Sequence, residues 1–315
     1  MSAFLAPGLH RIAPTRYHED PCERPSLSST LARAILDHSP LHAWTASKRL
    51  NPNWQPTDSK VFDIGRAAHR AVLGAGDDFA VIPDEILATN GAASTKEAKA
   101  FVADCRERGV TPIKADEAEE LYVMADICRA RLREMGIEID PERSELAALA
   151  EIDGVAVRAL IDNAPSSGPL IDFKTARDAS PDACIRAVTG YGYDVQIAHY
   201  LECWEAAAGE RRTMLLVFQE KTPPYELSVV ELLAQPDHEA DWMDDAHHKC
   251  AEARRIWGEC LSTGRWPGYP ARVALVGAPT WHRQRWADRV VLAAPPSAAI
   301  IARTTQWQAP TGDAA

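Results

Sequence analysis

The stretch that decides the fold is Leu170–Ile171–Asp172–Phe173–Lys174–Thr175. Ile171 and Phe173 alternate with Asp172 and Lys174, so the two charged side chains share one face of an extended chain. A further acid, Asp162, precedes this stretch in the sequence. Two acids and a lysine gathered on neighbouring strands form the smallest arrangement that can hold a divalent metal beside a phosphodiester.

The strands next to this stretch are also visible in the sequence. Runs rich in β-branched and aliphatic residues span Glu145–Ile152 and Val155–Asp162, with the hairpin signal Asp153–Gly154 between them. Residues 163–169, rich in Pro, Ser and Gly, turn the second run into the third. We therefore expect Glu145, Asp162, Asp172 and Lys174 on one small sheet.

These residue types suit one kind of chemistry. Hard oxygen ligands favour Mg²⁺ or Mn²⁺. Such an ion polarises a phosphoryl oxygen and lowers the pKa of a bound water, while a nearby lysine orients that water or stabilises the developing charge. The pattern predicts phosphodiester hydrolysis without a covalent intermediate.

Helices are expected around this sheet. Residues 60–73 have helical spacing with His69 on the flank of the apolar stripe. Helices are also predicted over 28–37, over 94–108 with a Ser94/Glu97 capping box, over 116–135, over 194–208 and over 237–260; two more strands are predicted over 214–219 and 226–232. The alternation indicates an α/β protein with a mixed central β-sheet flanked by helices.

Bulk properties set limits on the class of protein. The chain has 315 residues, 46% of them hydrophobic, and a net charge of −11, which argues mildly against a broad basic surface for nucleic acid but not against a local groove. There is no apolar run of about 18 residues and no secretory signal pattern, so we expect a cytoplasmic protein without a membrane partner. The seven cysteines never form a CxxC pair and are expected to be free and mostly buried.

The Asp162…Asp172–Phe173–Lys174 pattern resembles the PD-(D/E)xK nuclease superfamily, although no proline precedes Asp162. Further phrases are similar to its RecE-type (exonuclease VIII-like) branch of phage and prophage exodeoxyribonucleases. They are Pro25–Ser26–Leu27–Ser28–Ser29, His38–Ser39–Pro40–Leu41–His42–Ala43–Trp44, Gly65–Arg66–Ala67–Ala68–His69, Tyr191–Gly192–Tyr193–Asp194–Val195–Gln196 with Tyr200, and Gln219–Glu220–Lys221–Thr222–Pro223–Pro224–Tyr225. The resemblance covers residues 25–270.

The resemblance implies a restriction-endonuclease-like core and a role for each matching residue. His69, Asp162 and Asp172 would be metal ligands, the Phe173 carbonyl would complete the metal shell, and Lys174 would be the catalytic lysine. Glu145 would serve a possible second metal. Gln196 and Tyr200 match a QxxxY motif; spaced i and i+4, they share a helix face that could contact DNA or support the site.

Composition and periodicity along the chain also predict the domain organisation. We expect an irregular arm over 1–25, a single nuclease domain over 26–270 and a Trp- and Pro-rich tail over 271–315. Within the domain, the helical part would span 26–136, the sheet and site 144–232, and the C-terminal helix 237–260.

The activity implied by the resemblance is a Mg²⁺-dependent exodeoxyribonuclease acting 5′ to 3′ on linear duplex DNA in phage-type recombination. Double-stranded DNA ends would be its partners, together with a single-strand annealing protein, and the chain would form a homo-oligomer. Two alternatives stay open: an endonuclease or repair nuclease of the same superfamily, including relatives that carry an iron–sulfur cluster, and a non-catalytic DNA-binding scaffold. Trp266 and the tail residues Trp281 and Trp286 are expected to be packing anchors rather than platforms for base stacking.

Overall fold

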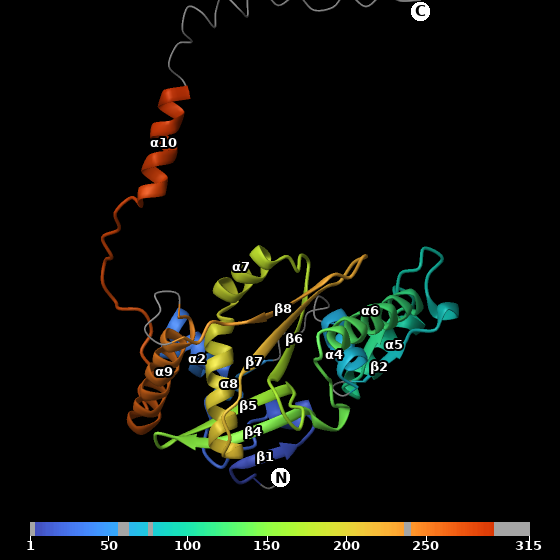
Figure 1. Ribbon diagram of the computed structural model, residues 1–315, viewed down its shortest axis with the longest axis horizontal. Helices are drawn as coiled ribbons and strands as arrows, with labels where there is room; N and C mark the ends of the chain where they lie inside the picture. The colour runs from blue at the N-terminus through green and yellow to red at the C-terminus, as the bar shows by residue number, and fades with distance from the viewer. Residues whose placement is uncertain (1–3, 56–62, 75–77, 236–240, 293–315) are drawn as a thin grey trace, which may run out of the picture. The chain divides into compact units, whose positions relative to one another are not determined.

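The computed structural model describes residues 4–55, 63–74, 78–235 and 241–292. The chain forms two compact units, Met1–Tyr269 and Pro270–Ala315. The first unit is built around a six-stranded sheet with the spatial order β1-β4-β5-β6-β7-β8 (Figure 1). Its strands are β1 Gly8–Arg11, β4 Ser144–Ile152, β5 Val155–Asn163, β6 Leu170–Ala176, β7 Met214–Glu220 and β8 Leu227–Glu231; a separate parallel pair consists of β2 Phe79–Val81 and β3 Thr111–Ile113.

The large sheet is mixed, as predicted. Strands β6 and β7 run parallel, and the other neighbours in the sheet pair antiparallel. A parallel pair needs a crossover connection, and here α7 and α8 provide it. The α-helices are α1 Pro14–His18, α2 Ser29–Asp37, α3 Pro40–Ala46, α4 Asp63–Leu73, α5 Lys96–Glu107, α6 Ala115–Glu134, α7 Pro181–Tyr191, α8 Tyr193–Ala208, α9 Met243–Thr263 and α10 Thr280–Leu292, with 3₁₀ turns at Asp84–Ile86 and Pro141–Arg143.

Helices cover both faces of the sheet. On one face, residues of α2, α8 and α9 pack on alternate residues of β4 and β5, and Trp204 and Trp257 are fully buried among them. On the other face, α4 and α6 pack against Ile171 and Phe173 of β6. Strand β6 is therefore enclosed between helices, which explains how its charged residues come to be shielded from water.

The hairpin between β4 and β5 confirms the turn prediction. Asp153 and Gly154 both have positive φ, 52° and 75°. Two consecutive residues with positive φ are the signature of the tight turn whose twist matches paired strands. The turn fixes the register in which Ile152 pairs with Val155 and Ser144 with Asn163.

Several local predictions differ from the structure. The segment predicted as an irregular arm contains β1, which pairs with β4, and the short helix α1. Helix α5 is capped by Thr95, whose side chain accepts from the Ala98 amide, instead of by Ser94. Helices α3 and α7 were not expected, and the long helix α9 extends further than predicted, to Thr263. The predicted start of that helix lies in part outside the described residues.

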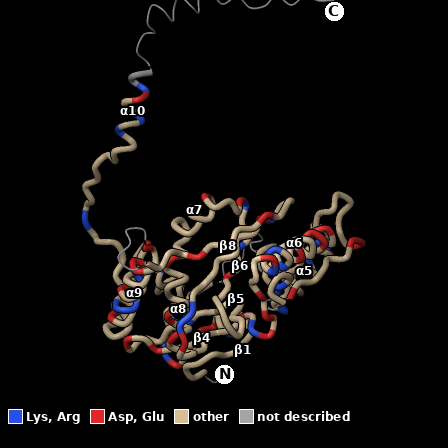
Figure 2. The backbone as a smooth tube through the Cα atoms, in the orientation of Figure 1, with Lys and Arg blue, Asp and Glu red and all other residues tan. Residues whose placement is uncertain are grey.

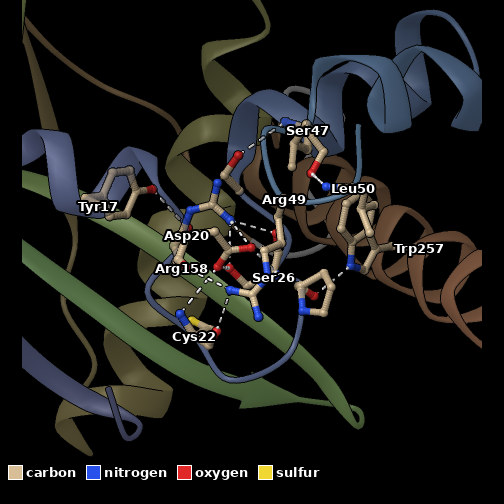
Figure 3. A network of polar contacts seen from close by, with 12 residues as sticks. Tyr17, Asp20, Cys22, Ser26, Ser47, Arg49, Leu50, Arg158 and Trp257 are labelled. Carbon is tan, nitrogen blue, oxygen red and sulfur yellow. Dashed lines mark hydrogen bonds and ion pairs between the residues drawn. The ribbon is translucent and has the colours of Figure 1, made fainter. Parts of the chain in front are cut away.

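A buried polar network fastens the N-terminal segment to β5 (Figure 3). Arg158 Nη1 donates to the Ser26 hydroxyl and carbonyl, each at 2.7 Å, and lies 3.4 Å from Asp20 Oδ2. The Ser26 amide and hydroxyl donate in turn to the Asp20 carboxylate at 2.9 and 2.6 Å. Arg49 donates to the Asp20 carbonyl from the neighbouring loop. We call Tyr17, Asp20, Ser26, Arg49 and Arg158 the anchor network.

The described part of the second unit contains α10 (Figure 2). Trp281 and Trp286 are each 66% exposed, so the prediction that they are packing anchors is wrong. Trp266, in the first unit, does pack, with its ring 5.1 Å from that of Trp257. Among the described helices, none is both long and apolar enough to cross a membrane.

Candidate active site

Strand β6 places its side chains as the alternation predicts. Ile171 and Phe173 are buried in the apolar layer under α4 and α6. Asp172 and Lys174 point to the opposite face, where Asp172 is 1% exposed and Lys174 Nζ lies 2.5 Å from Asp172 Oδ2. Two residues apart on one strand, the acid and the lysine thus form a direct ion pair in a largely buried position.

The sheet opens between β5 and β6, and Asp162 lies in the opening. Only Asn163 and Ile171 pair across these strands. Beyond that pair, the Phe173 amide donates to Asp162 Oδ2 at 2.8 Å. A side-chain carboxylate therefore replaces the backbone acceptor that a continuous ladder would supply, and the strands separate around it.

Three residues from three elements meet beside this opening. His69 of α4, Glu145 of β4 and Asp162 of β5 each bring a ligand atom, and these atoms lie within 4.8 Å of one another. His69 Nε2 is 3.6 Å from Asp162 Oδ2, and His69 Nδ1 is 3.8 Å from Glu145 Oε1. His69 Nε2 also lies 2.8 Å from the Phe173 carbonyl oxygen. We call His69, Glu145 and Asp162 the metal group.

Glu145 has an unusual backbone. Its φ is 54°, in the left-handed region that few residues other than glycine adopt. The flanking pairs Ser144–Asn163 and Leu146–Ile161 set it opposite Asp162 across the two strands. Backbone strain of this kind costs about 1–3 kcal/mol and concentrates at functional sites. The strained backbone favours a functional role for Glu145, for which the sequence motif suggests only service to a possible second metal.

Asp172 is held separately from the metal group. Gln196 Nε2 of α8 donates to Asp172 Oδ1 at 2.7 Å. The other oxygen, Oδ2, is buried, receives no hydrogen bond of good geometry among the described residues and faces the Lys174 ammonium. Phe173 connects the two groups, because its amide binds Asp162 and its carbonyl lies against His69. Gln196 therefore holds the Asp172 carboxylate in place, and the role predicted for it from the QxxxY pattern stays a prediction.

Two tyrosines of α8 border the site. The ring of Tyr193 lies 4.9 Å from Lys174 Nζ, a cation–π contact. Tyr200 is partly buried, and its pKa is raised by burial and by the charges of Tyr17, Asp172 and Asp162, against a hydrogen bond with Ser29. Tyr193 was not among the predicted site residues, although it belongs to the quoted Tyr191–Tyr193 phrase. Only the fold shows that its ring meets Lys174.

Burial and the close approach of several carboxylates shift the pKa values of four side chains in the site. Burial, together with neighbouring carboxylates, raises the pKa of Asp162 and raises that of Asp172 to about 6, although Lys174 opposes the shift. Burial alone would lower the pKa of His69, but Asp162 and Glu145 outweigh it and raise that pKa to about 9. In the same way, Asp172 and Asp162 raise the pKa of Lys174 despite its burial.

A divalent cation fits this set of donors. Three carboxylates and one ammonium leave a formal charge of −2, which a divalent cation would neutralise with His69 uncharged. The carboxylate oxygens and the Phe173 carbonyl are ligands of the kinds that suit Mg²⁺ and Mn²⁺, whereas the imidazole of His69 is a softer donor. The observed proximity of His69, Glu145 and Asp162 is consistent with this fit.

The other quoted phrases serve the scaffold. Leu27 bridges to Val157 of β5, and Ser28 caps α2. Pro40 begins α3, and Ser39 Oγ lies 2.7 Å from His42 Nδ1. Gln219 Nε2 donates to the Met124 carbonyl and so connects β7 to α6. All seven cysteines are free and buried, as predicted.

A family model and solved structures show similarity to this chain. Residues 34–278 match the family described as a PDDEXK-like domain of unknown function (DUF3799). The crystal structure of a provisionally named exonuclease from Eubacterium rectale is similar in fold, with a TM-score of 0.54, 14% identity and coverage of 87% of this chain and 98% of that one. An alkaline exonuclease from Laribacter hongkongensis aligns with a TM-score of 0.22, 14% identity and coverage of 65% and 98%. No curated protein sequence matches the chain.

Proposed function

Because the chain belongs to the PDDEXK-like DUF3799 family, we propose that it is a metal-dependent deoxyribonuclease. The observation that carries the proposal is the metal group, whose ligand atoms lie within 4.8 Å of one another, beside the Asp172–Lys174 ion pair. Crowded acids raise the free energy of the metal-free fold, and such sites are typical of catalytic centres.

His69, Glu145 and Asp162 would hold the cation, with the Phe173 carbonyl and Asp172 as further ligands. When bound, Mg²⁺ or Mn²⁺ would polarise a phosphoryl oxygen and lower the pKa of a water molecule. To bind the ion, the coordinating ring nitrogen of His69 would have to be unprotonated. The contact between His69 Nε2 and the Phe173 carbonyl oxygen, in contrast, favours a proton on Nε2.

Lys174 would act on the attacking water and on the charge that develops on the phosphate. Its ammonium is fixed from two sides, by Asp172 at 2.5 Å and by the Tyr193 ring at 4.9 Å. Gln196 fixes Asp172 in turn. This chain of contacts from α8 to β6 would hold the lysine in one position, and pre-positioned charge needs little reorganisation during the reaction.

We further propose exonuclease action on linear duplex ends, 5′ to 3′, in phage-type recombination. The support is the resemblance to the RecE-type branch and the provisional exonuclease name of the E. rectale neighbour. A homo-oligomer and a single-strand annealing partner belong to the same proposal. Between an enzyme and a non-catalytic scaffold, the half-buried Lys174 favours the enzyme, since DNA binding alone does not require a lysine paired with a buried acid.

The test compares linear with covalently closed circular duplex DNA, each incubated with Mg²⁺ and followed through labels on the 5′ or 3′ ends. We expect the linear DNA to lose its 5′ labels first and the circle to stay intact. EDTA should stop the reaction, and Asp172→Ala or Lys174→Ala should slow it by about 10²–10⁴-fold.

Lys99→Ala is the matched control, because Lys99 is an exposed lysine on α5 and its loss should leave the rate unchanged. Cleavage of the circle would favour the endonuclease alternative. Intact linear DNA with Mg²⁺ or Mn²⁺, combined with EDTA-insensitive DNA binding, would favour the scaffold.

A further inference from the structure

The C-terminal unit has a charge opposite to that of the rest of the chain. Residues 270–315 contain five arginines, no lysine and two aspartates, which gives a formal charge of +3. Since the whole chain has a net charge of −11, residues 1–269 have a net charge of −14. In the described part of the unit, α10 contributes Arg283, Arg285 and Arg289 (Figure 2). A cationic helix on an acidic protein points to an anionic partner.

One face of α10 combines these charges with an aromatic ring. His282, Arg285, Trp286 and Arg289 follow the spacing i, i+3, i+4 and i+7, which places them on one side of the helix. The same four side chains line a surface depression of about 280 Å³. We call them the α10 face.

Within α10, no side chain neutralises the two guanidinium groups of this face. Trp286 is 66% exposed, and no acidic side chain there forms an ion pair with Arg285 or Arg289. The acid of this helix, Asp288, accepts instead from Gln284 at 3.0 Å. A single exposed tryptophan is ordinary on a protein surface, but Trp286 lies between two guanidinium groups, and an aromatic ring beside cationic groups is a combination typical of surfaces that bind nucleic-acid strands.

We propose that the α10 face binds single-stranded DNA, with Arg285 and Arg289 on phosphates and Trp286 stacked on a base. The nature of the nucleic acid rests on the proposed function, because a nuclease acting on one strand leaves the other unpaired. Stacking on an aromatic ring requires an unstacked base, which a single strand offers and a duplex does not. A membrane surface fits less well, since the face is cationic and carries a single apolar group.

The test measures binding of the full chain to a fluorescein-labelled oligo-dT of about 20 nucleotides by fluorescence anisotropy, in EDTA and at several salt concentrations. The variant Arg285→Ala/Arg289→Ala removes two charges from the α10 face. Its matched control, Gln284→Glu/Ala287→Glu, changes the net charge by the same amount on the other side of the helix.

The wild type should bind with a steep dependence on salt. In the double arginine variant the slope of log K against log salt should fall by about 1.4, since each single-strand phosphate contact contributes about 0.7. Trp286→Ala should weaken binding about tenfold with the slope unchanged, and the control should bind within about twofold of the wild type.

Three results would overturn the proposal: binding by the arginine variant equal to the wild type, equal weakening by the control, or binding to phosphatidylserine vesicles but not to oligo-dT. The outcome is separable from that of the proposed function. An active nuclease whose α10 variants bind oligo-dT normally would refute only this inference, whereas α10-dependent binding without any cleavage would refute only the nuclease.

Discussion

Two buried polar clusters lie on the same strand, and they are built on opposite principles. Arg158 of the anchor network and Asp162 of the metal group are four residues apart on β5, so their side chains leave the same face of the sheet. Arg158 is compensated inside the protein by Asp20 and by two hydrogen bonds from its guanidinium to Ser26. Asp162 lies beside a further acid, Glu145, and burial together with Glu145 raises its pKa although His69 and Lys174 oppose the shift.

The difference separates two kinds of buried charge. The charges of the anchor network stabilise the fold, whereas those of the metal group are suited to binding a cation. A buried charge with its counter-charge in place stabilises the fold relative to losing one partner. Buried carboxylates without enough positive charge nearby lower the stability of the fold, and a bound cation removes that cost. We therefore expect changes in the anchor network to affect stability, and changes in the metal group to affect metal binding and catalysis.

Arg158→Met tests the anchor network and should have the largest effect on stability. It leaves Asp20 buried without its cation, so the free energy of unfolding should fall by about 3–5 kcal/mol, equally with EDTA and with Mg²⁺. Urea titrations measure this. Arg211→Ala, which removes an 86% exposed partner of Glu205, is the control and should change it by less than about 0.5 kcal/mol.

Adding Asp20→Asn to Arg158→Met should restore part of the lost stability, because the uncompensated charge is gone. If Arg158→Met costs stability only in EDTA, the anchor network is coupled to the metal group and the distinction between the two clusters fails.

His199 extends the anchor network and should make it sensitive to acid. Its Nε2 lies 3.0 Å from the Arg158 carbonyl oxygen, and burial lowers its pKa to about 4. Between pH 6.5 and 4 the unfolded chain binds a proton that the folded chain excludes. Stability from this group is therefore full above pH 6.5 and falls by about 3 kcal/mol as the pH drops to 4.

The measurement is the difference in unfolding free energy between the wild type and His199→Gln across this range. The wild type should lose stability relative to the variant as the pH falls. In the control His248→Gln, which removes a 77% exposed ring, stability should change with pH as it does in the wild type. If the stability of His199→Gln also changed with pH as in the wild type, His199 would not be the source of the acid sensitivity.

Tyr193→Leu tests the site with a smaller effect. Loss of the cation–π contact to Lys174 should cost about 1 kcal/mol, a reduction of about fivefold in the initial rate of DNA cleavage, with little change in stability. Tyr193→Phe keeps the ring and should retain the rate within about twofold. Equal losses in both variants would show that the hydroxyl group matters instead of the ring.

The sequence predicted much of the sheet because alternation and turn chemistry are local. The strands β4, β5 and β6, the Asp153–Gly154 turn and the shared face of Asp172 and Lys174 follow from the side-chain period of two. Ser94 and Thr95 are equally suitable caps for α5, and only the register of the helix chooses Thr95. Pro40 indicates the end of a helix in the sequence, but proline equally begins one, as it does in α3.

What could not be predicted arises from tertiary structure. The positive φ of Glu145 and the opening between β5 and β6 depend on contacts between distant segments. The cation–π contact of Tyr193 depends on where α8 crosses β6. The separation of Asp172 from the metal group is also invisible in a motif that simply names both residues.

The central claim is that the metal group is incomplete without a cation, and Asp162→Asn tests it most directly. The raised pKa of Asp162 means that its charged form is disfavoured in the metal-free fold, so a neutral side chain of the same shape should relieve that cost. The amide oxygen of the substituted side chain could still accept from the Phe173 amide.

The measurement is the free energy of unfolding of the wild type and Asp162→Asn, each in EDTA and in saturating Mg²⁺. We predict that the order of stability of the two proteins differs between the two conditions. In EDTA the variant is at least as stable as the wild type, whereas Mg²⁺ at about 100 times its Kd stabilises the wild type by about 2.7 kcal/mol and the variant much less. A variant that is less stable than the wild type by the same amount in both conditions would contradict the claim.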